Sequence, residues 1–232
     1  MNVRSRAQQR FARACWAMSA IAVVLLASAT GGCQLFGYLS HVVAGGGNEK
    51  KPRVEPEYLD LHDKTIAVLV NADEFTLYEH PEAPLAISLA VSARLAVNVP
   101  GAKLVNPDQL VQWQRDNPYW NTLRYSRLIH KLNVDRIVFI DLVQYSTHEP
   151  GNQYVLRGMV VANVSVIEAA EGDGTGGSGD DFAYATIVRT QFPEDSSVGL
   201  LDSDEQTVVL GMLANFSAHL SDLFHEHKGV SK

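Results

Sequence analysis

The pattern of apolar and polar positions divides the chain into an apolar N-terminal stretch, a polar linker and a long region of strand and helix patterns. Two largely apolar runs, residues 64–70 and 136–143, are bounded by polar residues and are too short to form helices. Runs of this kind are typical of strands that are buried on both faces of a sheet. The sequence therefore predicts two central strands.

Helical spacing or helix-start signals mark four segments, residues 84–97, 107–117, 122–131 and 204–224. Asn106 precedes Pro107 and stands three residues before Gln109, which is a typical helix start. In the last segment, apolar residues recur every three or four positions and predict a helix that covers one face of the sheet. Residues 71–82 are expected to form a loop.

A β-hairpin is predicted towards the C-terminus, where residues 153–168 and 182–192 are two long extended segments. The first strand alternates, with Val160, Ala162, Val164 and Val166 on one face. A Gly-rich stretch, residues 171–180, joins the two strands as a long loop. A further short strand is expected at residues 103–105.

The order of these elements predicts an α/β fold, a mixed sheet with helices packed on its faces. We expect a single domain at residues 58–226, followed by a short tail at residues 227–232. A domain of this length buries enough apolar surface to fold without disulfides.

The first 32 residues have the three zones of a bacterial lipoprotein signal peptide. Four arginines precede an apolar stretch, residues 14–27, which is too short to span a bilayer as a helix. Small residues then lead to Cys33, which resembles the site that lipoprotein signal peptidase cleaves. We therefore expect removal of residues 1–32, acylation of Cys33 and a flexible tether at residues 33–57. An ordinary cleaved signal, or an uncleaved signal anchor, would leave the domain on the same side of the membrane.

Composition narrows the possible functions. Loss of residues 1–32 removes four arginines and no acidic residue, which leaves 15 basic against 26 acidic residues and a net charge of −11. Such a chain repels nucleic acid, so the expected membrane contact is through the acyl chains. Cys15 lies in the removed segment, so neither disulfides nor Cys-ligated zinc are expected. Gln34 is not the Asp that retains lipoproteins in the inner membrane, which favours the outer membrane.

Catalytic motifs of the common hydrolase, nucleotide-binding and zinc-protease types do not occur in the sequence. We therefore predict a protein that is not an enzyme, with no cofactor, no metal and no evident small-molecule substrate. Five residues that follow the first strand carry acid-base groups: Asp73, Glu74, Glu79, His80 and Glu82. A solvated acidic loop is the favoured interpretation, whereas a deep pocket that holds His80 with a carboxylate would favour an envelope hydrolase.

Two segments of the sequence resemble metal-binding motifs. His225 and His227 flank Glu226, but alternate positions of a helix point to different sides, so a solvated helix end is favoured. Residues 176–181 match the first six positions of a calcium-binding nonapeptide. The match then fails, and a single copy lacks a neighbouring turn, so a loop without calcium is favoured for residues 171–181.

Aromatic residues cluster around the turn between the second and third predicted helices. Trp113, Tyr119, Trp120 and Tyr125 lie close together there. Aromatic side chains are common anchors in protein interfaces, and they are also common in cores. Core packing is the favoured interpretation, yet this turn is the predicted partner-binding surface.

The layout resembles a family of envelope lipoproteins and periplasmic domains that includes LpoB, the N-terminal domain of TolB and the core of CsgG. The resemblance rests on the lipid cysteine, the first strand at residues 64–70, the segment at residues 132–139 and the long strand at residues 154–167. Residues 132–139 resemble the family's Leu-Gly-Ala-Asp-Tyr-Val segment, which leads into the middle strand, with Asn133-Val134 in place of Gly-Ala. Domains of this family bind envelope partners or copies of themselves, and catalysis by this core is not expected.

The resulting hypothesis is a membrane-tethered, periplasm-facing envelope lipoprotein that acts as a non-catalytic protein-binding or scaffold module. The alternative is an oligomeric component of an envelope transport or secretion assembly. A monomer in solution would favour the first, and a stable ring the second.

Overall fold

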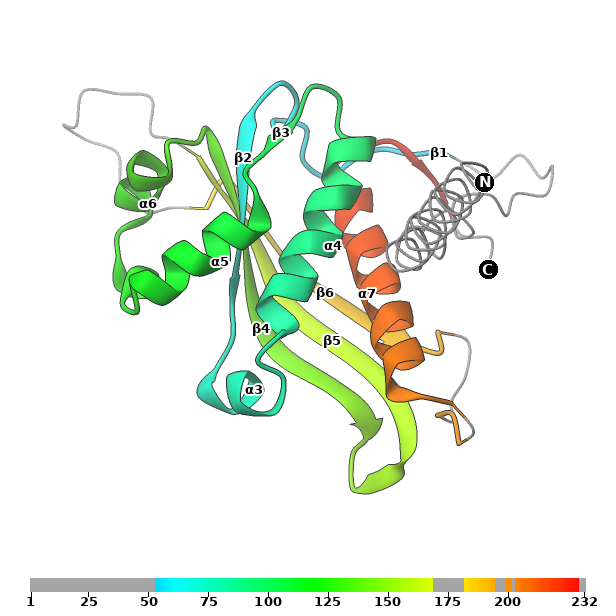
Figure 1. Ribbon diagram of the computed structural model, residues 1–232. Helices are drawn as coiled ribbons and strands as arrows, with labels where there is room; N and C mark the ends of the chain where they lie inside the picture. Colours follow the sequence, from blue (N-terminus) through cyan, green and yellow to red (C-terminus); the bar gives the residue numbers. More distant parts are fainter. Residues whose placement is uncertain (1–52, 169–181, 195–198, 202, 230–232) are drawn as a thin grey trace, which may run out of the picture. The chain divides into compact units, whose positions relative to one another are not determined.

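The structure, a computed structural model, describes residues 53–168, 182–194, 199–201 and 203–229. Its main sheet has five strands (Figure 1). Strand β2 lies parallel to both of its neighbours, β3 and β4, whereas β5 lies antiparallel to both of its neighbours, β4 and β6. In spatial order the strands are β3 (Lys103–Leu104), β2 (Thr65–Asn71), β4 (Arg136–Glu149), β5 (Asn152–Glu168) and β6 (Tyr184–Phe192).

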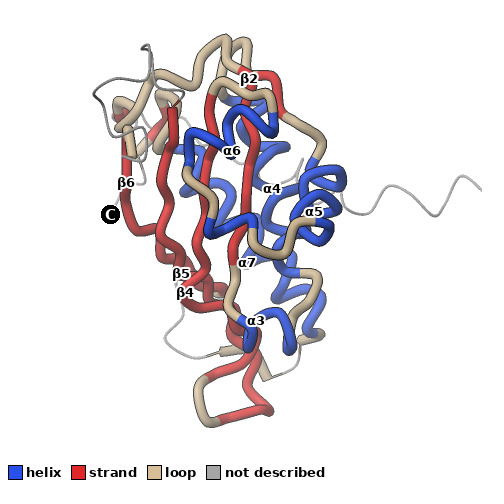
Figure 2. Tube along the Cα trace, turned by 90° about the vertical axis from the view of Figure 1, so that its left-hand side faces the viewer, coloured by secondary structure: helices blue, strands red, loops and turns tan. Residues whose placement is uncertain are grey.

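Helices pack on the sheet, which confirms the predicted α/β fold with a mixed sheet. The helical elements are α3 (Glu74–Glu79), α4 (Ala83–Asn98), α5 (Pro107–Asp116), the 3₁₀ turn η1 (Trp120–Thr122), α6 (Tyr125–Leu132) and α7 (Glu205–Asp222). Figure 2 shows the strands from the side that carries α6, with α4 and α7 behind them. Among the described residues, no helix has both the length and the apolar character needed to cross a bilayer.

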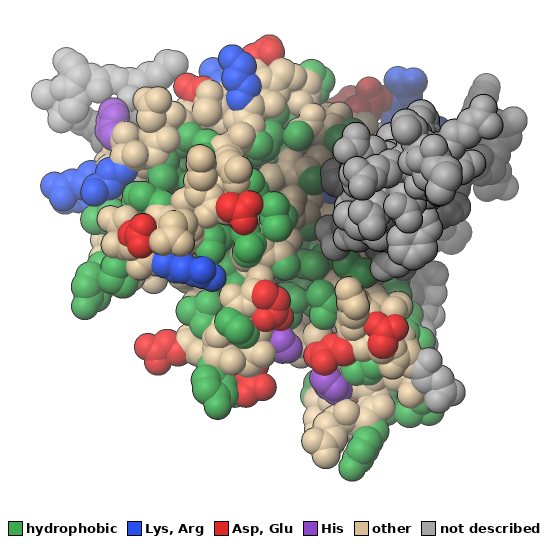
Figure 3. Space-filling view, in the orientation of Figure 1, with side chains coloured by type: hydrophobic (Ala, Val, Ile, Leu, Met, Phe, Trp, Pro, Cys, Tyr) green, Lys and Arg blue, Asp and Glu red, His purple; other side chains and the backbone are tan. Residues whose placement is uncertain are grey.

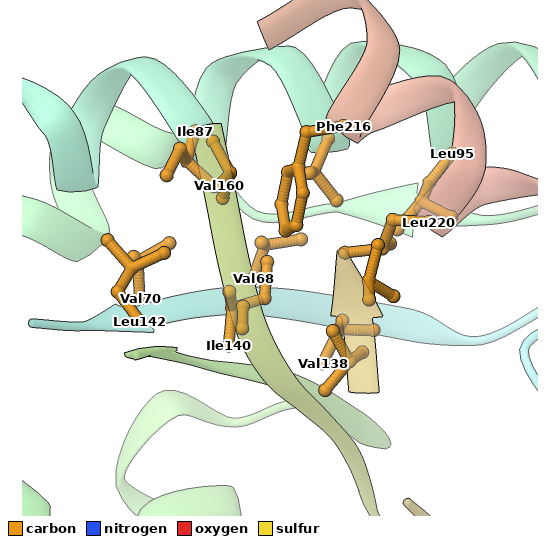
Figure 4. Close-up of a cluster of buried hydrophobic side chains, with 14 of the residues drawn as sticks. Val68, Val70, Ile87, Leu95, Val138, Ile140, Leu142, Val160, Phe216 and Leu220 are labelled. Carbon is orange, nitrogen blue, oxygen red and sulfur yellow. The ribbon is translucent and has the colours of Figure 1, made fainter. Parts of the chain in front are cut away.

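The larger core lies between the sheet and the pair α4 and α7. Alternate residues of each strand point to this side, and Figure 4 shows side chains of β2, β4 and β5 facing those of the two helices. Phe216 and Leu220 of α7 and Ile87 of α4 are fully buried there. Burial of each such side chain stabilises the fold by roughly 1.5–3 kcal/mol. The predicted apolar face of β5 belongs to this core.

A second, smaller core lies on the opposite face of the sheet, under α5, η1 and α6. Ala67 and Leu69 supply the β2 side, and Leu110, Trp120 and Leu128 supply the helical side. Since β2 is buried on both faces, its sequence is continuously apolar rather than alternating. The two cores explain why the strand pattern at residues 64–70 predicted a central strand.

Side chains complete the hydrogen bonding of β2 where its short partner β3 ends. The hydroxyl of Ser88 donates to the carbonyl of Val68 at 3.0 Å, and the amide of Gln114 donates to the carbonyl of Val70 at 3.0 Å. A buried carbonyl without a partner is destabilising, so α4 and α5 replace the missing strand. This accounts for two polar residues on helix faces that point into the protein.

The structure differs from the predictions at α3, at β4 and at the C-terminal end, where α7 ends at Asp222 and His227 lies in a short strand, not in the expected solvated helix end. The predicted loop at residues 71–82 contains α3, and β4 continues six residues beyond the predicted strand end at residue 143. The extension pairs with β5 through three register shifts, which follow Leu142, Ser146 and His148. These bulges interrupt the simple alternation that sequence reading relies on.

The chain segment that enters the fold is tied to its C-terminal part. Strands β1 (Arg53–Val54) and β7 (His227–Lys228) pair with each other, and the backbone N–H groups of Glu57 and Tyr58 donate to the carbonyl of Leu223. The described fold therefore includes residues on both sides of the expected 58–226 region.

Candidate functional site

Helix α3 begins where Asp73 caps it. The backbone N–H of Thr76 donates to the Asp73 carboxylate at 2.7 Å, and this bond lowers the pKa of Asp73 below its ordinary value. The helix ends when the N–H of His80 donates to the carbonyl of Thr76 at 2.8 Å. Four of the five predicted acid-base residues therefore cap, belong to or terminate one short helix, which fixes their positions relative to one another.

Exposed apolar side chains are concentrated on α3. Phe75 is 71% exposed, Tyr78 is 83% exposed and Leu77 is 43% exposed. Within the described residues, no other helix or strand contributes three large exposed apolar side chains. A six-residue helix that presents two aromatic rings to solvent is poorly explained by folding stability, since neither ring is buried.

A cleft of about 610 Å³ lies beside α3. Residues of α3 and its C-terminal end form one side, the far end of β4 forms the floor, and the first turns of α7 form the other side. Figure 3 shows histidine and acidic side chains gathered around this hollow between α3 and the lower end of α7. The bulged extension of β4, absent from the sequence prediction, brings the floor under α3.

Tyr145 lies at the floor of the cleft and contacts His80, which belongs to the side formed by α3. Their rings meet edge to face with centroids 4.9 Å apart. Tyr145 is 7% exposed, and its hydroxyl has no hydrogen-bond partner among the described residues. Burial raises the pKa of this hydroxyl, and the negative charges of Glu82 and Glu205 raise it further. Tyr145 therefore keeps its proton in the field of these two carboxylates.

The remaining polar contacts hold the wall of the cleft in place. The hydroxyl of Thr147 donates to Glu205 at 2.7 Å and lies 2.9 Å from Nδ1 of His148. Across the cleft, Nδ1 of His80 lies 3.8 Å from the Glu82 carboxylate. Because Thr147 is only 2% exposed and already bonded, it orders Glu205 and His148 rather than meeting a substrate.

The cleft does bring His80 together with carboxylates, which is the arrangement named above as favouring a hydrolase. It joins Glu79 and Glu82 to Glu205, a residue more than 120 positions later in the chain. The described residues contain no group of three or more His, Cys, Asp or Glu side chains placed to hold a metal ion. Together, the side chains that line the cleft form a concave surface that is rich in carboxylates and partly aromatic.

The four predicted partner-binding aromatics fall in different environments. Trp120 is 7% exposed and packs edge to face on Phe139, with centroids 5.9 Å apart. Tyr125 packs between Phe139 and Phe182, and Trp113 is partly buried against the same smaller core. Tyr119 is 78% exposed. Of the predicted set, Tyr119 is the most exposed, Trp113 and Tyr125 are partly buried, and Trp120 is buried.

The other predicted sites are placed as follows. Nδ1 of His225 contacts the carbonyl of Ser221, and His227 belongs to β7. Cys33 and the signal segment at residues 1–32 lie outside the described residues, as does the Gly-rich loop at residues 171–181.

Sequence reasoning located one half of the cleft and missed the other. Tyr145, Thr147 and Glu205 carry no motif, and their roles depend on the approach of α7 to the end of β4. One local signal could have placed Glu205 in the first turn of α7, because Asp204 directly before it is a typical helix cap.

Comparisons with known proteins give distant structural similarity. No protein-family profile matches the chain, and no curated protein sequence matches it. The fold is similar to a PelC dodecamer subunit from Paraburkholderia phytofirmans, with a TM-score of 0.43, 12% identity, and coverage of 76% of this chain and 97% of that one. It is also similar to lipoprotein GNA1162 from Neisseria meningitidis, with a TM-score of 0.42, 13% identity, and coverage of 67% and 96%.

Proposed function

We propose that this chain is an envelope lipoprotein, anchored through acyl chains on Cys33, whose domain binds a protein partner through α3 and acts without catalysis. The domain faces the periplasm, and the outer membrane is the favoured anchor site. The observation that carries the binding role is the exposure of Phe75 and Tyr78 on one short helix beside a cleft.

The chemistry and shape of this surface support a protein partner. Aromatic side chains are enriched among the residues that dominate binding energy in protein interfaces. Leu77 faces a second hollow of about 290 Å³ on the other side of α3, lined in part by Pro81 and Trp120. Helix α3 thus stands between two concave surfaces, which is a suitable shape for interlocking with another protein.

The anchor is tested by metabolic labelling with a radioactive fatty acid. The unaltered protein should carry label and partition with membranes, whereas Cys33→Ala should carry none. Label on the Cys33→Ala protein, or an unlabelled natural protein that retains residue 1, would show that the lipoprotein assignment is wrong.

Docking is tested by site-specific photo-crosslinking in intact cells. A photoreactive residue at position 75 or 78 should give one dominant adduct, whereas the same residue at Val97, which is 83% exposed on α4, should give none. The adduct's mass and tryptic peptides identify a different protein or a second copy of the chain. Adducts from position 97 alone, or from none of the three positions, would contradict docking through α3.

Affinity for the crosslinked partner gives a quantitative check. Phe75→Ala with Tyr78→Ala should weaken binding by about thirtyfold or more, because even one buried aromatic anchor contributes at least about 2 kcal/mol. Tyr119→Ala is the matched comparison, since it removes an equally exposed aromatic from the predicted aromatic turn. A loss caused by Tyr119→Ala with none from the α3 variant would move the interface to that turn.

A further inference from the structure

We infer that the cleft beside α3 is a receptor for an organic cation, the ammonium or guanidinium group of a lysine or arginine side chain on the partner. This inference rests on the proposed docking function and adds the chemistry of the group that is recognised. Three features of the cleft carry it: its charge, its aromatic floor and its unpaired buried hydroxyl.

Carboxylates dominate the lining of the cleft. Among the described residues that line it, Glu79, Glu82 and Glu205 contribute carboxylates from both sides, none is Lys or Arg, and the imidazoles are those of His80 and His148. The side chain of Glu82 is 60% exposed, so its charge is accessible to a ligand. A concave surface with charges of one sign concentrates the field and attracts groups of the opposite sign.

Aromatic side chains provide the second feature. Tyr145 lies at the floor, the His80 ring packs against it, and Phe75 stands at the rim. A cation held over aromatic faces gains electrostatic attraction beyond that of the carboxylates. The combination of carboxylates with aromatic rings distinguishes an organic cation from a metal ion, which requires converging oxygen or nitrogen ligands.

The unpaired hydroxyl of Tyr145 is the third feature. This side chain is more than nine-tenths buried, lines the cleft and lacks a hydrogen-bond partner among the described residues. A buried polar group without a partner is unfavourable, and an N–H donor in the cleft would relieve that. The volume of about 610 Å³ falls within the range of about 300–1,000 Å³ typical of small-ligand sites.

Ligand-observed NMR with the full chain in a neutral detergent tests this inference. The probes are the Nα-acetyl methylamides of arginine, lysine and citrulline, the last being a neutral isostere of arginine. We expect the arginine and lysine probes to bind at least about fivefold more tightly than the citrulline probe. Added salt should weaken the binding of the two charged probes. Equal binding of citrulline, or no binding of any probe, would overturn the inference.

Paired variants locate the site. Glu82→Gln with Glu205→Gln should weaken arginine binding about fivefold or more, and the side-chain amide oxygen that Glu205→Gln introduces can still accept the Thr147 hydrogen bond. Glu55→Gln with Asp116→Asn removes the same charge outside the cleft and should leave binding unchanged. Equal effects of the two variant pairs would show that only the net charge of the protein matters, and would overturn the cleft as the binding site.

A further comparison tests the source of the cation. Tighter binding of putrescine than of an arginine-containing tripeptide would show that the recognised cation is not a protein side chain.

The two proposals fail in different ways. If the Glu82 and Glu205 variant retains full affinity for the crosslinked partner while the Phe75 and Tyr78 variant loses it, docking stands and the cation inference is wrong. If amino-acid probes bind as expected but no adduct forms at position 75 or 78, the cleft recognises cations and docking through α3 is wrong.

Discussion

Close approach of α7 to the sheet depends on two glycines. A Cβ atom at Gly158 of β5 would lie 2.9 Å from Cβ of Met212, and one at Gly211 of α7 would lie 2.4 Å from the ring of Phe192. Both distances are shorter than real side chains tolerate. The absence of two side chains therefore lets α7 rest directly on β5 and β6, and so places Glu205 at the cleft.

Gly211→Ala should destabilise the domain although alanine is the better helix former. Helix propensity favours alanine by about 0.5–1 kcal/mol, but overpacking against Phe192 opposes it by about 1–3 kcal/mol. Chemical denaturation of the single variant measures the net effect. In a Phe192→Leu background the penalty should shrink, and an unchanged penalty there would argue against the ring contact as its cause.

Asp135 is expected to make the stability of the domain depend on pH. Its carboxylate accepts a hydrogen bond from the backbone N–H of Thr65 at 2.7 Å, and this bond lowers the pKa of Asp135 below its ordinary value. A lowered carboxyl pKa contributes stability that is present above the ordinary value and is lost as pH falls through the folded-state value. The difference in unfolding free energy between the natural protein and Asp135→Asn should therefore be constant near neutral pH. It should decrease towards zero as the pH falls below about 4. Asp60→Asn is the control, and a difference that persists in acid would contradict the assignment.

At the scale of elements, β2 determines how the helices are placed. It is the strand that both cores share, and its carbonyls beyond β3 are satisfied by α4 and α5. A strand with an unpaired edge would be destabilised and would invite pairing with other chains. Helix α4 therefore serves as both a core element and a cover for this edge.

Two serines on α4 allow a matched test of that role. Ser88→Ala should destabilise the domain by about 1–3 kcal/mol, because it leaves the buried Val68 carbonyl without its partner. Ser92→Ala should be neutral or stabilising, because the buried Ser92 hydroxyl has no hydrogen-bond partner in the part of the chain that the structure describes. Both unfolding free energies come from urea titration. Equal losses at the two positions would mean that packing, not the hydrogen bond, is what Ser88 supplies.

For the whole molecule, the segment before β2 is part of the fold. Tyr58 packs with Tyr184 and Phe224, and its hydroxyl is hydrogen bonded to Glu168. Leu61 is fully buried in the larger core, whereas Leu59 is 55% exposed. This segment therefore links the expected tether directly to the C-terminal helix and the end of the sheet.

Leu61→Ala should destabilise the domain by about 2–5 kcal/mol, as expected for a cavity in a well-packed core. Leu59→Ala, the same change two residues earlier, should remain within about 0.5 kcal/mol of the natural protein. Thermal and urea unfolding distinguish the two. Similar stabilities for both variants would show that the segment does not belong to the cooperative unit.

The sequence alone determined the α/β class, the two central strands and most helices, because burial on both faces and capping residues such as Asn106 leave local patterns. Membership of the LpoB, TolB and CsgG family, the lipid on Cys33 and the partner surface at Trp113, Tyr119, Trp120 and Tyr125 stay predictions. Only the tertiary structure revealed α3 and the cleft. Bulges in β4 break the strand period, and a site assembled from residues more than 120 positions apart depends on packing that no local pattern records.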